Sequence, residues 1–109
     1  MIPDEDIERA LTWLASNAIK AASARAQREY LDEFRRSKRA VLMSQSDAKT
    51  VSERETYAYM HPEYLELLEG YKAAVEADEK NRWLLEAAKA KIEVWRSQQA
   101  NARTQEKVT

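Results

Sequence analysis

The stretch that decides the fold is "SARAQREYLDEFRRSKRAVL", residues 23–42, which holds six Arg and Lys side chains in a protein of 109 residues and net charge −1. Neither Gly nor Pro interrupts it. At about 100° per residue, one helical face gathers most of the apolar side chains, and a basic stripe flanks that face. The residues of this face are Ala24, Gln27, Leu31, Phe34, Lys38, Val41 and Leu42. The pattern predicts a long helix whose positive charge needs a partner.

Charge is arranged in four blocks along the chain. Residues 1–19 hold one basic and four acidic side chains, a net of −3, and residues 20–50 hold eight and four, a net of +4. Residues 51–80 hold three and eight, a net of −5, and residues 81–109 hold six and three, a net of +3. If the chain folds back near residue 50, each block lies along a block of opposite sign. Since parallel pairing aligns like charges, the sequence predicts an antiparallel hairpin of two long helices.

Composition indicates an all-α protein. The chain contains one Gly, two Pro and no Cys, and its length suits a single helical domain over residues 1–109. We expect a long helix over about 4–44, a short connecting helix over about 51–60 and a long helix over about 62–100. A frayed polar tail is expected over 101–109.

Local signals set the expected helix ends. The acidic run that begins at Asp4 complements the positive end of a helix dipole. Thr50 and Glu53 have the spacing of a capping box. The short helix should end at His61, because Pro62 disfavours a helical backbone before it and suits the first position of the next helix. Gly70 is too weak a breaker to end the last helix.

Two interpretations of the basic stripe remain open. The stripe consists of Arg25, Arg28, Arg35, Arg36 and Arg39, and Lys38 lies in the apolar face beside it. In one interpretation the guanidinium groups pair with carboxylates of the returning helix, namely Glu63, Glu66, Glu69 and Glu76. In the other, the stripe and Lys38 bind the phosphates of single-stranded nucleic acid, with Tyr30 and Phe34 as stacking groups.

The last helix carries two apolar stripes. One stripe consists of Leu85, Ala88, Ile92 and Trp95, and the other of Trp83, Ala87, Ala90 and Val94. A lone hairpin buries only one of them. Trp13 likewise points away from the Ile7, Leu11, Leu14 and Ala18 stripe of the first helix. We therefore predict a homo-oligomer interface formed by Trp13, Trp83, Ala87, Ala90 and Val94, with a heterologous protein partner as the alternative.

Polar residues within the apolar stripes suggest structural roles. Lys38 is expected to reach the rim of its face or to pair with a carboxylate. Asp78 and Arg82 are spaced four residues apart and can satisfy one another. Tyr57, Tyr59, Tyr64 and Tyr71 gather near the turn and are expected to pack there.

The sequence lacks the residue patterns of common catalytic sites. His61 is the only histidine, there is no Gly-rich phosphate loop, and there is no thiol. We expect no enzyme activity, no catalytic residue, no metal and no cofactor. The acidic N-terminus is unlike a signal peptide, and no apolar run has the about 20 residues needed to cross a bilayer. We expect a soluble, cytoplasmic protein, in the host cytoplasm if it is phage-encoded, with no membrane partner.

Three segments carry a resemblance: "REYLDEFRRSKRAVLM", "KTVSERETYAYMHPEYLELLEGYKAAV" and "RWLLEAAKAKIEVWRSQQA". Over roughly residues 25–100 the chain resembles short all-helical bacteriophage proteins of replication and recombination modules. In size, helical layout and basic segment it is similar, more loosely, to phage UvsY-type recombination mediators. That resemblance implies an oligomeric accessory protein that binds single-stranded DNA and helps to load a recombinase.

Three functional hypotheses follow. The first is a phage-type accessory protein of DNA recombination or replication that binds single-stranded nucleic acid as a helical oligomer, with recombination proteins as further partners. The second is a coiled-coil adaptor or inhibitor that binds another protein. The third is an oligomeric sponge for small nucleotide ligands, held by Lys38, Arg82 and tyrosines. The near-neutral net charge weighs against the first, because a free DNA-binding surface leaves a basic excess.

Overall fold

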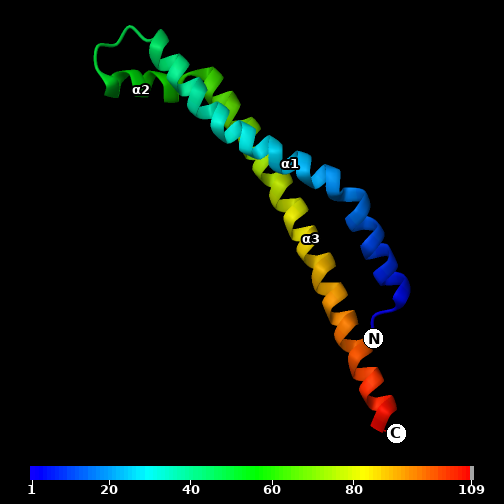
Figure 1. The fold of residues 1–109 in the computed structure, drawn as a ribbon. Coiled ribbons are helices and arrows are strands. Elements are labelled where there is room, and N and C mark those ends of the chain that lie inside the picture. The colour runs from blue at the N-terminus through cyan, green and yellow to red at the C-terminus, as the bar shows by residue number, and fades with distance from the viewer. Residues whose placement is uncertain (109) are drawn as a thin grey trace. The chain divides into compact units, whose positions relative to one another are not determined.

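The computed structural model describes residues 1–108 and contains three α-helices within that range. Helix α1 spans Asp4–Gln45, α2 spans Val51–Met60 and α3 spans Pro62–Val108 (Figure 1). Residues 1–108 contain no β-strand. The expected all-α fold, with one long helix towards each end of the chain and a short helix between them, is confirmed.

The helix ends follow the local sequence signals. The side chain of Thr50 accepts a hydrogen bond from the backbone N–H of Glu53 at 3.2 Å and so caps α2. Helix α2 ends at Met60 because His61, which precedes Pro62, has an extended backbone with φ −66° and ψ 133°. The predicted N-cap and the predicted break between α2 and α3 are both confirmed.

The C-terminal end differs from expectation. The sequence suggests a frayed tail from about residue 101, whereas α3 continues to Val108. The stretch contains good helix formers and neither Gly nor Pro, and Lys107 lies in the last turn, where it complements the helix dipole. Thr109, the last residue of the predicted tail, lies outside the described residues.

The chain divides into two compact units. The terminal unit consists of Met1–Ala21 and the part of α3 that begins at Lys80. The central unit consists of Ala22–Glu79 and so includes all of α2. Each long helix contributes a segment to both units.

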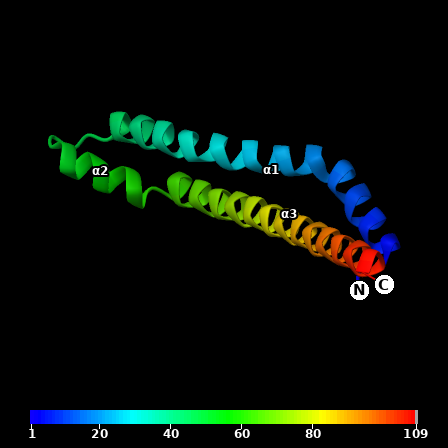
Figure 2. The same ribbon diagram turned by 60° about the horizontal axis from the view of Figure 1, so that its bottom comes forward.

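In the terminal unit, the first residues of the chain lie along the second half of α3 (Figure 2). The backbone N–H of Ile2 donates to Gln98 Oε1 at 2.8 Å, and Trp95 Nε1–H donates to Asp4 Oδ1 at 2.9 Å. Lys91 Nζ lies 3.7 Å from Asp6 Oδ2. Since partners on α3 move backwards as positions on α1 advance, the two segments run antiparallel, as the charge blocks predict.

In the central unit, α2 packs near the end of α1 and the start of α3. The fully buried Leu42 forms a core cluster with Ala58 of α2 and Tyr64 of α3. Met43 and Leu68 pack against this cluster. Two ion pairs, Arg28 with Asp78 and Lys38 with Glu63, show that α1 and α3 also run antiparallel in this unit.

Candidate functional site

The six predicted nucleic-acid-binding residues all lie on α1 in the central unit, and each has a local partner. Two of them bridge to α3. Arg28 Nη1 lies 3.2 Å from Asp78 Oδ2 and 2.9 Å from Glu79 Oε1. Lys38 Nζ lies 2.7 Å from Glu63 Oε2. These two cations therefore hold α1 to α3 rather than face solvent alone.

Three of the arginines pair with carboxylates of α1 itself. Arg25 pairs with Glu29 at 3.1 Å, Arg35 with Asp32 at 2.8 Å, and Arg36 with Glu33 at 3.1 Å. Arg36 also lies 3.7 Å from Asp32. Pairs between residues three or four apart on an exposed helix contribute little to stability, so these guanidinium groups can exchange partners readily.

Tyrosines of α2 and α3 receive the remaining guanidinium contacts. Arg35 lies over the Tyr71 ring at 5.3 Å from its centroid, and Arg39 lies over the Tyr59 ring at 5.6 Å. Arg39 also donates a hydrogen bond to the Tyr59 hydroxyl. Tyr59 in turn meets the buried Tyr64 edge to face, with ring centroids 5.4 Å apart. The predicted packing of tyrosines near the turn is thus formed around arginines as well as apolar side chains.

The acidic partners of the basic stripe differ from the expected set. Glu63 pairs with α1 through Lys38. Within residues 1–108, however, the side chains of Glu66, Glu69 and Glu76 form no ion pair, and all of them are exposed. Asp78 accepts from Arg28, where the sequence suggests Arg82 as its partner. The expected pairing of the stripe with Glu66, Glu69 and Glu76 is therefore wrong.

The inner face of α1 in the central unit is turned relative to the predicted one. Phe34 and Val41, expected to face the returning helix, are 40% and 49% exposed. Arg28, Arg35 and Arg39, expected beside the apolar face, are half-buried. An arginine can bury its aliphatic stem while its guanidinium reaches a carboxylate or a ring, so these side chains take inner positions that hydrophobicity alone assigns to others.

The charges of this region perturb several titrations. The hydrogen bond from Arg35 lowers the pKa of Asp32, and the hydrogen bond from Lys38 lowers the pKa of Glu63. The hydrogen bond to Glu79 raises the pKa of Arg28. Each of these shifts favours the charged form of the group concerned, as expected for groups held in ion pairs.

The α3 part of the predicted oligomer interface lies in the terminal unit, and α3 there has an inner and an outer stripe. The inner stripe, made of Leu85, Ala88, Ile92 and Trp95, is half-buried. We call the other one the outer stripe, and its members Trp83, Ala87, Ala90 and Val94 are all exposed. Trp83 is 64% exposed and Val94 is 49% exposed. The predicted division of the last helix into two stripes, with only one covered, is confirmed.

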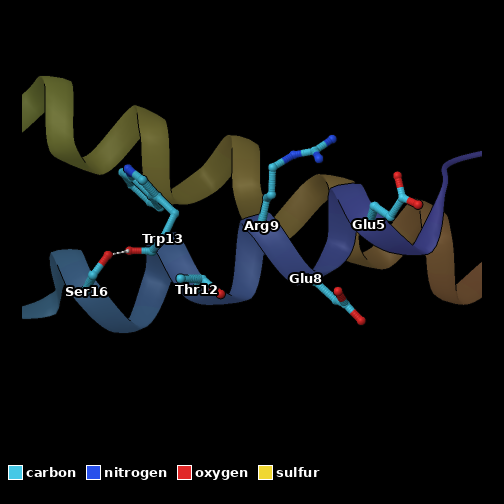
Figure 3. A pocket seen from close by; sticks show the side chains of 6 residues that line it. All are labelled: Glu5, Glu8, Arg9, Thr12, Trp13 and Ser16. Atoms are coloured by element: carbon cyan, nitrogen blue, oxygen red, sulfur yellow. Dashed lines mark hydrogen bonds between the residues drawn. The ribbon is translucent and has the colours of Figure 1, made fainter.

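The remaining residue of the predicted interface, Trp13, lies on α1 in the terminal unit. Figure 3 shows its indole projecting from α1 on the same side as Arg9, whereas Glu8 projects to the other side. Trp13 is half-buried and shares one pocket with Leu84, Ala87 and Ala88 of α3. It also lines an apolar pocket of about 330 Å³ with Leu14, Ala18 and Leu85 among others. Trp13 thus faces α3 of its own chain, and Leu11, predicted to do so, is 52% exposed.

Sequence reasoning missed a groove in the central unit. Its lining residues are Phe34, Lys38, Glu63, Glu66, Leu67 and Gly70, and its volume is about 370 Å³. Gly70 is the only glycine of the chain. It has no positive φ, and a Cβ added to it meets nothing within 4 Å. A glycine inside a helix costs about 1 kcal/mol relative to Ala. The sequence feature that could have indicated this groove is the lone glycine in a long, otherwise uninterrupted helix.

The two aromatic residues that the sequence suggests as stacking groups form an exposed pair on α1. The rings of Tyr30 and Phe34 are stacked, with centroids 5.8 Å apart and planes 10° from parallel. Tyr30 is 61% exposed. The basic stripe faces another side of α1, since Arg28, Arg35 and Arg39 turn inward while this pair turns outward. Tyr30 and Phe34 are four residues apart, a spacing that places them side by side on a helix.

The described residues were also searched for a metal site and for a membrane-spanning helix. Among the described residues, no group of three or more His, Asp and Glu side chains is placed to hold a metal ion. None of the three helices, over the residues described, is both long and apolar enough to cross a membrane.

The comparisons with known proteins found no matching family model, no matching curated protein and no matching solved structure.

Proposed function

We propose that this chain is a helical assembly protein that works through protein–protein contact, and that its first partner is a second copy of itself bound at the outer stripe of α3. The observation that carries the proposal is the exposure of that stripe. Trp83 and Val94 are 64% and 49% exposed, while the inner stripe of the same helix is already covered by α1. Contiguous exposed apolar faces of this kind mark interaction surfaces.

The chemistry of the stripe suits a helix-to-helix contact. Trp83 is the residue type that most often dominates interface energies, and Ala87 and Ala90 let another helix approach closely. Only Ile7, Leu42, Ala58, Tyr64 and Ala74 are buried apolar residues within the described chain. An assembly that covers Trp83 and Val94 supplies apolar burial that one copy does not achieve alone.

The experiment compares matched pairs of variants by size-exclusion chromatography with light scattering. Val94→Glu should abolish self-association, whereas Val41→Glu, which changes a valine of the same 49% exposure in the central unit, should not. Trp83→Ala should weaken self-association by roughly 2 kcal/mol or more, whereas Tyr57→Ala, at 41% exposure on α2, should not. A monomeric wild-type protein at all concentrations contradicts the proposal. If Val94→Glu and Val41→Glu self-associate equally, the outer stripe is not the interface.

A second candidate function is binding of single-stranded nucleic acid, as a phage-type accessory protein of recombination or replication. The observation that favours it is that Arg25 and Arg36 have side chains 72% and 55% exposed and pair only with residues of their own helix. Exchange of such a pair for a phosphate loses little, since exposed ion pairs are weak. The acidic neighbours Glu29 and Glu33 repel a polyanion, so we rank this function second.

A gel-shift titration against single-stranded DNA tests the second function. Replacement of Arg25 and Arg36 together by Ala should weaken binding, and the salt dependence should become shallower because fewer counterions are released. Arg96→Ala is the matched control, since Arg96 is 69% exposed and pairs with Glu93 three residues before it. Absent or salt-independent binding by the wild-type protein contradicts this function.

A further inference from the structure

The groove of the central unit, lined by Phe34, Leu67 and Gly70 at its apolar part, has the features of a receptor for a large side chain. Phe34 is 40% exposed and Leu67 is half-buried, so apolar atoms are accessible there. Lys38 and Glu63 form the ion pair at its edge, and Glu66 completes the lining.

The second feature of the groove is Gly70, a glycine within a long helix. Glycine is favoured where φ is positive or where a close approach to the backbone leaves no room for a Cβ. Gly70 has no positive φ, and a Cβ built on it meets no atom of the chain within 4 Å. Neither reason therefore lies within the described chain. The space beside position 70 is therefore open to another molecule, which can approach the backbone there more closely than beside any residue that has a side chain.

Charge identifies the kind of molecule that fits. Lys38 and Glu63 neutralise one another at the groove, whereas Glu66 is exposed and forms no ion pair within residues 1–108, so the lining carries one unpaired negative charge. The chain itself presents a complementary surface in the terminal unit. Trp83 is 64% exposed, the guanidinium of Arg82 lies 5.5 Å from its ring centroid, and exposed Lys80 lies one helical turn before it. A tryptophan with a lysine beside it is therefore complementary in charge to an apolar groove whose lining holds the unpaired Glu66.

We propose that Trp83 of one copy inserts into the Phe34–Leu67–Gly70 groove of a second copy, with Lys80 of the first copy facing Glu66 of the second. This inference rests on the proposed function and names the surface that the outer stripe binds. The two contacting surfaces are different parts of the chain, so the contact is heterologous. Such contacts build closed rings or open filaments rather than a two-fold dimer.

Mixing of two variants tests the pairing. Trp83→Ala keeps the groove and loses the inserted side chain, and Gly70→Leu keeps the tryptophan and fills the groove. Each variant alone should lose self-association by about tenfold or more. Their mixture should form a one-to-one complex that grows no further, because the surfaces left over are the two damaged ones. Native mass spectrometry separates this mixed dimer from either variant by mass.

The outcomes separate this inference from the proposed function. If Gly70→Leu assembles like the wild type while Trp83→Ala does not, the outer stripe is the interface and the groove is not its partner. If Trp83→Ala and Val94→Glu both assemble like the wild type, both proposals fail. If each variant alone is monomeric and their mixture stays monomeric, the groove pairing is overturned.

A charge exchange provides an independent check that does not change groove volume. Glu66→Lys should weaken self-association, and Glu66→Lys combined with Lys80→Glu should restore it. Lack of restoration contradicts the Lys80–Glu66 contact. Circular dichroism controls for folding: because nothing lies within 4 Å of a Cβ at position 70, Gly70→Leu should keep its helicity and melt at or above the wild-type temperature. Should Gly70→Leu melt lower, Gly70→Ala replaces it in the mixing experiment, with a smaller expected loss.

Discussion

The two compact units differ in how much of their own apolar surface they bury. The central unit contains four of the five buried apolar residues of the described chain, Leu42, Ala58, Tyr64 and Ala74, and three of these form one cluster. The terminal unit contains the fifth, Ile7. Both units expose large apolar side chains, for example Trp83 and Val94 in the terminal unit and Tyr30 and Val41 in the central one, so the difference lies in what is buried.

The difference follows from the number of helices that meet in each unit. In the central unit a third helix, α2, adds Ala58 to the contact between α1 and α3. In the terminal unit two helical segments face one another, and each can cover only one stripe of the other. A two-helix unit is therefore the natural place for a partner to complete the packing, which is the role we propose for a second copy.

The largest expected effect comes from the core cluster. Leu42→Ala should destabilise the protein by about 2–5 kcal/mol, because Leu42 is fully buried and its removal leaves a cavity between three helices. Ile7→Ala, in the terminal unit, should cost nearer to about 2 kcal/mol, since its surroundings are open enough to collapse or admit water. Urea denaturation followed by circular dichroism measures both. A larger loss from Ile7→Ala would reverse the comparison between the units.

Hydrogen exchange should show the same difference directly. At low protein concentration, amides of α3 from Leu85 to Val94 should exchange faster than those of the buried Ala58 and Tyr64, because fewer tertiary contacts oppose local opening. As concentration rises and copies associate, protection in Leu85–Val94 should increase by about tenfold, or about 1.4 kcal/mol. Exchange at Ala58 should stay constant. Protection in Leu85–Val94 that does not depend on concentration contradicts assembly through the outer stripe.

The cap of α2 has a smaller expected effect. Thr50→Ala should cost about 1 kcal/mol, because it removes the hydrogen bond to the Glu53 amide at the start of the helix that makes the central unit three-helical. Thr56→Ala is the matched control in the same helix. The Thr56 hydroxyl bonds to the Ser52 carbonyl within α2, so its removal should be close to neutral. Thermal melts of the two variants give the difference, and equal losses would show that Thr50 does not act as a cap.

The sequence predicts the elements of this fold better than the faces they present. Thr50, Glu53 and Pro62 act locally, so their effect on helix ends is visible in the sequence. The face that α1 turns inward depends on tertiary partners. Arg35 lies over Tyr71 and Arg39 over Tyr59, and these contacts place arginines where a count of apolar residues places Phe34 and Val41.

The candidate sites, like the helix faces, are predictable from the sequence only where they depend on one helix alone. The exposed outer stripe of α3 followed from periodicity, because only a stripe opposite the inner one is left uncovered. The groove did not, because residues of α1 and of α3 line it together, and the register between the two helices decides which of them meet. Pairing of Arg28 with Glu79, and of Lys38 with Glu63, was likewise set by register between helices. Net charge per block predicts the direction of pairing but not which carboxylate is reached.

The smallest expected effect is a pH dependence that acts on the better-packed unit. Asp32 and Glu63 both lie in the central unit, and their cationic partners lower the pKa of each. Because the folded pKa lies below the unfolded one, these carboxylates stabilise the fold above their unfolded pKa, and that contribution is lost as pH falls through the folded pKa. As pH falls, the central unit should therefore lose stability towards the level of the terminal unit.

An NMR titration of the Glu63 carboxyl tests the cause. Lys38→Met should raise the pKa of Glu63, whereas Lys72→Met, which removes an exposed lysine elsewhere on α3, should leave it unchanged. A Glu63 titration that is the same in both variants would show that the Lys38 ion pair does not hold this carboxylate in its charged form.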